Sequence, residues 1–211
     1  MTERYFEIID TEDKAYWLGF LYADGCVSND LHYLTIDLST TDIEHIEKFK
    51  NEINAHQKIS ISSTTDGISH ARLHIGCKIM CNDLVKKGCV PRKSLVLTFP
   101  SEDILPRHLV PHFIRGYFDG DGGLSTFYAH RKDRPNPQFH CELSFLGTTD
   151  MLEHIKSYIN MDSEKIYKVG NIYKFRVQTK QKIIQICEYL YKDSHCYLER
   201  KYNKYITQIK I

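Results

Sequence analysis

The sequence predicts an α+β protein built from two pseudo-symmetric copies of an α-β-β-α-β-β-α unit. Three features each occur twice: an apolar segment that ends in Asp-Gly, an alternating segment that runs into Thr-Asp, and an Arg-Lys pair. The second occurrence follows the first by 97 residues for the apolar segment and by 108 residues for the other two. Because these anchors agree, we expect a duplicated architecture with an 11-residue insertion in the second copy.

Each copy opens with a predicted helix, "AYWLGFLYADG" at 15–25 and "FIRGYFDGDG" at 113–122. The alternating runs "LHYLTIDLS" and "QFHCELSFL" then predict strands, and Thr-Asp predicts the N-cap of an amphipathic helix. Each copy continues with a second strand pair and a closing helix, expected at about 57–75 and 77–88 in the first copy and at 164–178 and 179–192 in the second.

Proline-bearing stretches mark the connections. The segment 97–111 contains three prolines and is expected to link a first half at 1–96 to a second half at 112–211. The polar stretch "YAHRKDRPNPQ" at 128–138 is the simplest place for the insertion, because a long hairpin loop tolerates added length.

Small residues lie four apart in both opening helices, at Gly19 and Ala23 and at Gly116 and Gly120. This spacing puts each pair on one helix face, where small side chains let two backbones approach closely. A glycine inside a helix otherwise costs about 1 kcal/mol relative to alanine. We therefore expect the two helices to pack on each other; the alternative is that each packs only on its own sheet.

Such packing brings Asp24 and Asp121 together at the negative ends of two helix dipoles. Two neighbouring carboxylates repel each other, and a divalent cation would relieve the repulsion. Hard oxygen ligands that hold Mg²⁺ are what metal-dependent phosphodiester cleavage requires. The alternative is that both are plain Asp-Gly helix stops that lead into turns.

The composition is that of an ordinary globular protein, with 211 residues, 42% hydrophobic and 26% charged. A polar N-terminus and the lack of an apolar stretch of about 18 residues give no support for a secretory signal or a membrane span. We expect a soluble, intracellular protein.

The cysteines and histidines give no metal signature. Seven cysteines without a C-x-x-C motif favour reduced thiols over a disulfide framework. Cys77 and Cys81 are four apart but are better explained as small buried residues, and Pro111 separates His108 from His112. We expect no structural zinc.

Charge distribution is more informative than the net charge of +1. The segment "KIYKVGNIYKFRVQTKQK" at 165–182 carries six basic residues and no acid, interleaved with aromatic residues. It predicts a basic stripe on strand-like sequence, either a nucleic-acid contact or a solvated strand face.

Together, "WLGFLYADG" at 17–25 and "IRGYFDGDG" at 114–122 resemble the two signature helices of the LAGLIDADG homing endonucleases, in particular the two-motif, single-chain members. The resemblance covers about 10–205. It implies a homing endonuclease-like fold in which the motif helices form the interface between two half-domains. Each half-domain contributes an antiparallel sheet to a saddle that straddles DNA, and the chain is expected to be a monomer with internal pseudo-two-fold symmetry.

The resemblance also implies a catalytic centre. The last acid of each motif, Asp24 and Asp121, is expected to bind catalytic Mg²⁺, with help from the backbone carbonyls of Ala23 and Gly120. Mn²⁺ is a possible replacement and Ca²⁺ a non-cleaving substitute. Asp119 aligns with Tyr22 in the repeat, so it is expected to support the site without binding metal.

A basic residue and a water-organising polar residue are implied around each active site. Lys93 and Lys201 match in the repeat and are the candidates for the basic residues, although both are also explained as surface lysines. Thr40 and Thr148 are weaker candidates for the polar residues.

DNA recognition is expected from side chains that project off the strands. The candidates in the first half are Ser28, Asn29, His32, Lys58, Ser62, His70 and Arg72. Those in the second half are Arg131, Lys132, Arg134, Gln138, Lys168, Asn171, Lys174, Arg176 and Gln178. The second half is more basic, so unequal contributions to affinity are expected.

The leading functional hypothesis is a metal-dependent, site-specific double-strand DNA endonuclease with a long, asymmetric target and short 3′ overhangs. Two alternatives use the same fold: an RNA maturase that assists intron splicing, and a DNA-binding regulator that does not cleave. Both motif acids are present, which favours cleavage.

Overall fold

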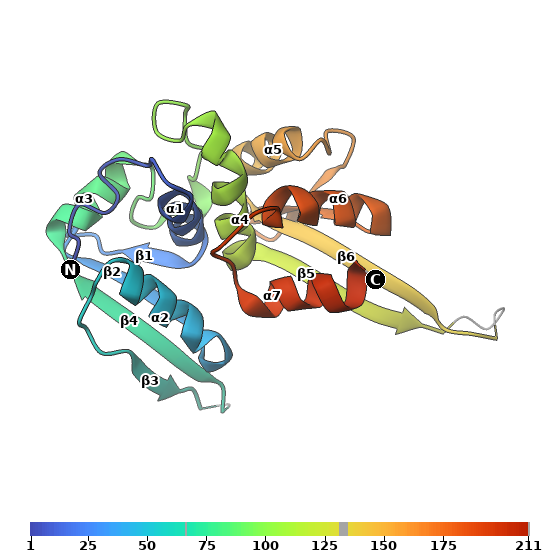
Figure 1. Cartoon of the computed structure of the whole chain (residues 1–211), viewed down its shortest axis with the longest axis horizontal. Coiled ribbons are helices and arrows are strands. Elements are labelled where there is room, and N and C mark those ends of the chain that lie inside the picture. Colours follow the sequence, from blue (N-terminus) through green and yellow to red (C-terminus); the bar gives the residue numbers. More distant parts are fainter. Residues whose placement is uncertain (66, 131–134, 211) are drawn as a thin grey trace.

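The computed structural model describes residues 1–65, 67–130 and 135–210 and shows the same order of elements twice (Figure 1). The first copy contains α1 (Glu12–Asp24), β1 (Gly25–Val27), β2 (Tyr33–Ser39), α2 (Ile43–Glu52), β3 (Ser60–Ser63), β4 (Ser69–Gly76) and α3 (Lys78–Lys86). The second contains α4 (Val110–Asp121), β5 (Gly122–Ala129), β6 (Gln138–Gly147), α5 (Thr149–Tyr158), β7 (Ile166–Val169), β8 (Ile172–Val177) and α6 (Lys180–Tyr191). The expected α+β repeat is confirmed.

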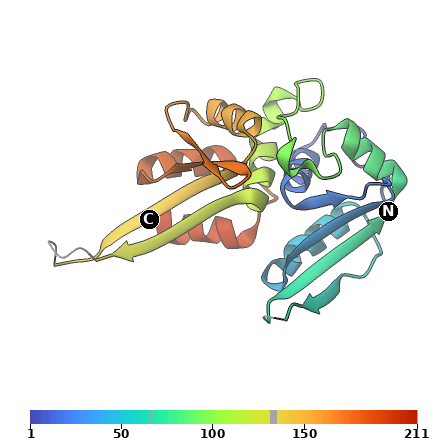
Figure 2. The same ribbon diagram turned by 180° about the vertical axis from the view of Figure 1, so that it is seen from behind.

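Each copy forms a four-stranded antiparallel sheet, in the order β1-β2-β4-β3 and β5-β6-β8-β7. Alternate side chains of β4 are buried, namely Ala71, Leu73 and Ile75, whereas those between them are more exposed. The helices cover the buried face of each sheet. Figure 2 shows the strands of both sheets in front of the helices, so the uncovered faces, here called the outer faces, are turned to the same side.

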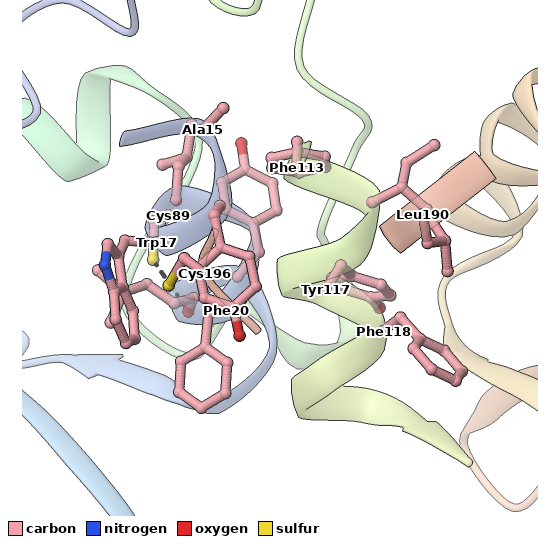
Figure 3. Close-up of a cluster of buried hydrophobic side chains, with 14 of the residues drawn as sticks. Ala15, Trp17, Phe20, Cys89, Phe113, Tyr117, Phe118, Leu190 and Cys196 are labelled. Atoms are coloured by element: carbon pink, nitrogen blue, oxygen red, sulfur yellow. Dashed lines mark hydrogen bonds between the residues drawn. The ribbon is translucent and has the colours of Figure 1, made fainter. Parts of the chain in front are cut away.

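Helices α1 and α4 lie side by side between the two sheets (Figures 1 and 3). The ring of Trp17 packs on Phe49 of α2 at 4.9 Å, and the ring of Phe118 packs on Phe145 of β6 at 5.1 Å. The side of each motif helix turned away from its partner therefore forms the core of its own half.

The insertion falls in the hairpin β5–β6. Strand β5 has 8 residues where β1 has 3, and the second hairpin extends well beyond the body of the molecule (Figure 1). The predicted linker is irregular up to a 3-10 turn at Arg107–Leu109, after which α4 begins with Pro111 in its first turn.

Two short elements were not expected from the sequence. Lys93 begins a 3-10 turn (Lys93–Leu95), and Lys201 lies on a further helix, α7 (Glu199–Lys204), which continues as a π-helical segment (Tyr205–Ile209). The Arg-Lys pairs that match in the repeat therefore have different local structures.

Among the described residues, no helix is long and apolar enough to span a membrane.

Candidate active site

The glycines of the motif helices lie where the two backbones meet. A Cβ atom at Gly19 would overlap the carbonyl oxygen of Phe113, and one at Gly116 would overlap the carbonyl oxygen of Tyr16. The helices therefore pack on each other through their small residues, and the alternative of two separately packed helices does not hold. This contact fixes the relative position of the helix ends.

Asp24 and Asp121 are the last residues of α1 and α4. A Cβ atom at Gly120 would overlap that of Ala23 and would lie 3.3 Å from Oδ2 of Asp24. The carboxylate of Asp24 thus lies against the residue that precedes Asp121. The structure brings together the two acids that the sequence places 97 residues apart.

The carboxyl groups of this pair resist ionisation. Burial and then the charge of Asp24 raise the pKa of Asp121 to about 6, although Lys93 and Lys201 act in the opposite direction. Burial also raises the pKa of Asp24, against the same two lysines. Desolvated like charges of this kind are stabilised by a bound cation.

Lys201 stabilises the end of the second motif helix. Its Nζ donates hydrogen bonds to the carbonyl oxygens of Phe118 (2.5 Å), Asp119 (2.7 Å) and Gly122 (2.6 Å). An ammonium group has three N–H donors, and these three acceptors use all of them. Burial lowers the pKa of Lys201 to about 8.

Lys93 occupies the matching place in the first half but is bound less completely. Its Nζ donates to the carbonyl oxygen of Gly25, directly after α1, and within the described residues this is its one hydrogen bond. Lys93 is buried, with 8% of its surface exposed. Both predicted lysines therefore lie at the ends of the motif helices, but Lys93 has N–H donors that no other described group takes up.

Asp119 is fully engaged inside the protein. Its carboxylate accepts hydrogen bonds from the hydroxyls of Tyr16 (2.8 Å) and Tyr191 (3.2 Å) and from the backbone N–H of Leu198 (2.7 Å). Burial raises its pKa. Asp119 therefore connects α1, α6 and the segment that leads to Lys201.

The two threonine candidates lie at the start of the second helix of each half. Thr148 is the N-cap of α5, where its Oγ1 accepts from the N–H of Met151 (3.2 Å) and donates to the carbonyl of Leu97 (2.6 Å). Thr40 opens a 3-10 turn before α2. For Thr148 these contacts indicate a capping residue and not a water-organising one.

The donor atoms at the helix ends suit a hard divalent cation. Within the described ranges, no group of three or more His, Cys, Asp or Glu side chains is placed to hold a metal. A cation between Asp24 and Asp121 would need backbone oxygens as further ligands. The last carbonyls of a helix lack intrahelical partners, and Lys201 does not take up that of Gly120. Two carboxylates with carbonyl oxygens fit Mg²⁺ or Ca²⁺.

Residues predicted to contact DNA in the first half gather around the outer face. His70 and Arg72 of β4 both bind Asp37 of β2, Arg72 through Nε at 2.8 Å and Nη2 at 2.5 Å. Ser62 pairs with His70 on the same face. The others are in the β1–β2 turn (Ser28, Asn29, His32) or two residues before β3 (Lys58).

In the second half, three predicted residues converge on Glu142 of β6. Its carboxylate accepts from Lys174 (3.0 Å), Arg176 (3.4 Å) and Gln178 (2.9 Å). Gln138 lies on the same face, and Asn171 lies in the β7–β8 turn. Strand pairing places Lys168 opposite Tyr173, on the helix-covered side of the sheet. Tyr167 is opposite Lys174 and therefore lies on the outer face, where Lys168 was expected. Arg131, Lys132 and Arg134 lie outside the described residues.

Sequence reasoning missed several outer-face residues. The acids Asp37 and Glu142 hold the basic side chains in place, and exposed aromatic rings stack on histidines, Tyr33 on His74 at 4.5 Å and Phe127 on His140 at 5.2 Å. Every second residue of a strand lies on the same face, so the alternation around Arg72 and Arg176 could have identified these positions from the sequence.

Comparisons with known proteins agree with this fold. Residues 114–211 match the family model described as LAGLIDADG endonuclease. The solved structure of the meganuclease I-SmaMI bound to uncleaveable DNA superposes with a TM-score of 0.61 at 12% identity, over 90% of this chain and 87% of that one. The meganuclease I-CpaMI bound to uncleaved DNA gives 0.60 at 12% identity, over 94% and 89%.

A third structure, the LAGLIDADG meganuclease I-AabMI bound to uncleaved DNA, gives a TM-score of 0.58 at 14% identity, over 90% of this chain and 86% of that one. No curated protein matches the sequence. The duplicated fold, with acids at the ends of two packed glycine-bearing helices, defines a two-motif, single-chain architecture. The match of residues 114–211 relates the second half of the chain to the LAGLIDADG endonuclease family, and the chain as a whole shares the fold of these meganucleases.

Proposed function

We propose that this protein is a site-specific DNA endonuclease that cuts both strands of a long, asymmetric target and leaves short 3′ overhangs. The observation that carries the proposal is the placement of Asp24 and Asp121, which end two packed helices and lie within the charge influence of Lys93 and Lys201. The DNA-bound structures of I-SmaMI and I-AabMI support DNA as the substrate class.

The carboxylates of Asp24 and Asp121, with the carbonyl oxygens of Ala23 and Gly120, would hold Mg²⁺, with Mn²⁺ as a possible replacement. When bound, the cation supplies an activated water and offsets charge on the phosphate oxygens. Ca²⁺ is the proposed non-cleaving substitute, in keeping with the I-SmaMI structure with calcium ions and an uncleaved target.

The two lysines have different proposed roles because their hydrogen bonds differ. Lys93 has N–H donors left for a phosphate oxygen or a water molecule, so it is the candidate for direct stabilisation of developing charge. Lys201 uses its three donors on carbonyl oxygens around Asp121. It therefore holds the end of α4, and with it Asp121, in place.

Target recognition is assigned to the outer faces of the two sheets. Arg72 and Arg176 are preordered by Asp37 and Glu142, and a preordered fork of N–H donors suits bidentate contacts to base edges in the major groove. The two outer faces carry different side chains although their strand order is the same. This difference predicts an asymmetric target for a single chain.

The experiment that tests this function is selection of cleaved sites from a randomised or genomic DNA library in the presence of Mg²⁺, followed by cleavage assays with Asp24→Asn and Asp121→Asn. Each variant keeps the shape of the side chain but removes a charged ligand. We expect both variants to bind the selected DNA and to lose double-strand cleavage by at least 100-fold.

The matched control is Glu47→Gln, an exposed acid on α2, a helix on the side of the sheet opposite the outer face. It is expected to cleave at the wild-type rate. Normal cleavage by both Asp24→Asn and Asp121→Asn would refute the catalytic assignment. Binding of structured intron RNA without DNA cleavage by the wild type would instead establish the maturase alternative.

A further inference from the structure

The segment that carries Lys201 crosses to the first half of the molecule. Arg200 donates from Nε (3.1 and 3.2 Å) and Nη2 (2.9 Å) to the carboxylate of Asp42, directly before α2. Lys48 of α2 pairs with Glu199 at 2.8 Å. The two residues before Lys201 are thus bound by the second helix of the opposite half.

Asp42 is not used as its position in the sequence predicts. It occupies the N-cap of α2, but its side chain makes no capping hydrogen bond. An N-cap side chain that caps contributes about 1 kcal/mol to helix stability, so this carboxylate gives up that contribution to bind Arg200. Asp42 is 8% exposed and the Arg200 side chain is 55% exposed, and the two nitrogen donors make the pair bidentate, which adds geometric specificity.

The segment that follows Lys93 makes the reciprocal crossing. The hydroxyl of Thr148 donates to the carbonyl of Leu97 (2.6 Å), and Oδ2 of Asp150 accepts from the N–H of Phe99 (2.7 Å). Leu97 is joined to Lys93 by a backbone hydrogen bond of 3.0 Å. The second helix of the second half therefore holds the lysine segment of the first.

We infer that Asp42 and Asp150 are positioning residues, each of which places the active-site lysine of the opposite half. They match each other in the repeat, at the shift of 108 residues. Asp42 acts through Arg200 on Lys201 and so on the end of α4; Asp150 acts through Phe99 and Leu97 on Lys93. Each lysine then reaches its place only when the two halves are docked.

The first test does not require DNA, so it remains informative even if the proposed nuclease function fails. Reaction of the folded protein with acetic anhydride, read by mass spectrometry at each lysine, reports how tightly each amine is held. We expect Asp42→Asn to raise the reactivity of Lys201 at least threefold and to leave Lys93 unchanged. Asp150→Asn is expected to do the reverse.

Arg200→Gln provides a second route to the same contact, because the Arg200 side chain is 55% exposed and its replacement need not disturb packing. It is expected to reproduce the Lys201 pattern of Asp42→Asn. The charge-exchanged double variant, Asp42→Arg with Arg200→Asp, is expected to return Lys201 reactivity towards the wild-type level. Glu44→Gln, an exposed acid in the first turn of the same helix, is the matched control and is expected to change neither lysine.

The functional arm rests on the proposed endonuclease activity and follows each strand of end-labelled DNA separately. The two lysines are related by the pseudo-two-fold axis, so Asp42→Asn and Asp150→Asn are expected to slow opposite strands at least fivefold and to accumulate nicked DNA. Unchanged Lys201 reactivity in both Asp42→Asn and Arg200→Gln would overturn the inference. So would equal slowing of both strands by both aspartate variants.

Discussion

Asp119 and Asp121 lie two residues apart on α4, but their surroundings assign them to different tasks. Asp119 is 2% exposed and accepts three hydrogen bonds from groups of the protein. Asp121 ends the helix next to Asp24, and the charge of Asp24 helps to raise its pKa to about 6. A buried carboxylate that accepts three hydrogen bonds from the protein is structural, whereas one held near another carboxylate is suited to a cation.

At the scale of single residues, we predict that Lys201→Met destabilises the fold. Three carbonyl oxygens would lose a charged donor, and a hydrogen bond to a charged group contributes about 1.5–3 kcal/mol. We expect the free energy of unfolding, measured with urea, to fall by about 3–5 kcal/mol. Lys93→Met removes one such hydrogen bond and is the matched comparison, with an expected loss of about 1–2 kcal/mol. Equal losses in the two variants would contradict the different roles proposed for these lysines.

Helices α1 and α4 act as one unit because each uses its glycine face for the partner and its opposite face for its own half. The glycines at the contact leave no room for a side chain, since backbone carbonyls of the facing helix occupy that space. The hairpin β5–β6 extends from the body, with Tyr128 67% exposed.

Gly116→Ala tests this helix contact. The added methyl group would overlap the carbonyl oxygen of Tyr16, and overpacking of this kind typically costs about 1–3 kcal/mol. We expect thermal unfolding at a lower temperature together with slower DNA cleavage, because separation of the helices moves Asp24 away from Asp121. Gly76→Ala is the control, since a Cβ there would meet only Tyr33 at an ordinary 3.5 Å. A Gly116→Ala protein as stable and active as Gly76→Ala would show that the helices do not pack this closely.

The whole molecule places its active-site candidates at the junction of two halves that are tied together by crossed contacts. Arg115 of α4 is fully buried and pairs with Glu12 of α1 at 2.7 Å, in addition to the crossed contacts of Asp42 and Asp150. The buried junction contains several ionisable groups, so its stability depends on pH.

Calcium binding provides a prediction at this scale. Because the folded-state pKa of Asp121 is raised, its ionisation disfavours the metal-free fold as the pH rises from about 4 through about 6. A bound cation reverses this effect, but only when the carboxyl group has lost its proton. We expect 5 mM Ca²⁺ to raise the unfolding temperature measurably at pH 7.5 and much less at pH 5.

The Asp24→Asn, Asp121→Asn double variant is the control for the calcium experiment. It keeps the shape of both side chains but removes both charges, so no calcium-dependent shift is expected at either pH. An equal shift in the double variant and in the wild type would place the calcium site elsewhere on the protein.

The sequence was sufficient for features that are local or repeated. The order of the repeated elements, the glycine spacing, the place of the insertion and the pairing of Asp24 with Asp121 all followed from it, because helix and strand periodicities and an internal duplication can be read from the order of residues. The sequence was less informative where the pairing of neighbouring strands decides on which face of the sheet a residue lies. Lys168 was expected on the outer face, but the pairing of β7 with β8 turns it to the other side.

Contacts between residues far apart in the chain were decided only by the tertiary structure. The sequence marks Asp42 as a helix cap and Lys201 as a basic residue, but folding binds Asp42 to Arg200 and surrounds Lys201 with three carbonyl oxygens. A residue's type and spacing determine which face of an element it occupies. The groups that it meets there depend on how two halves dock, and this docking is set by the close approach of two helix backbones.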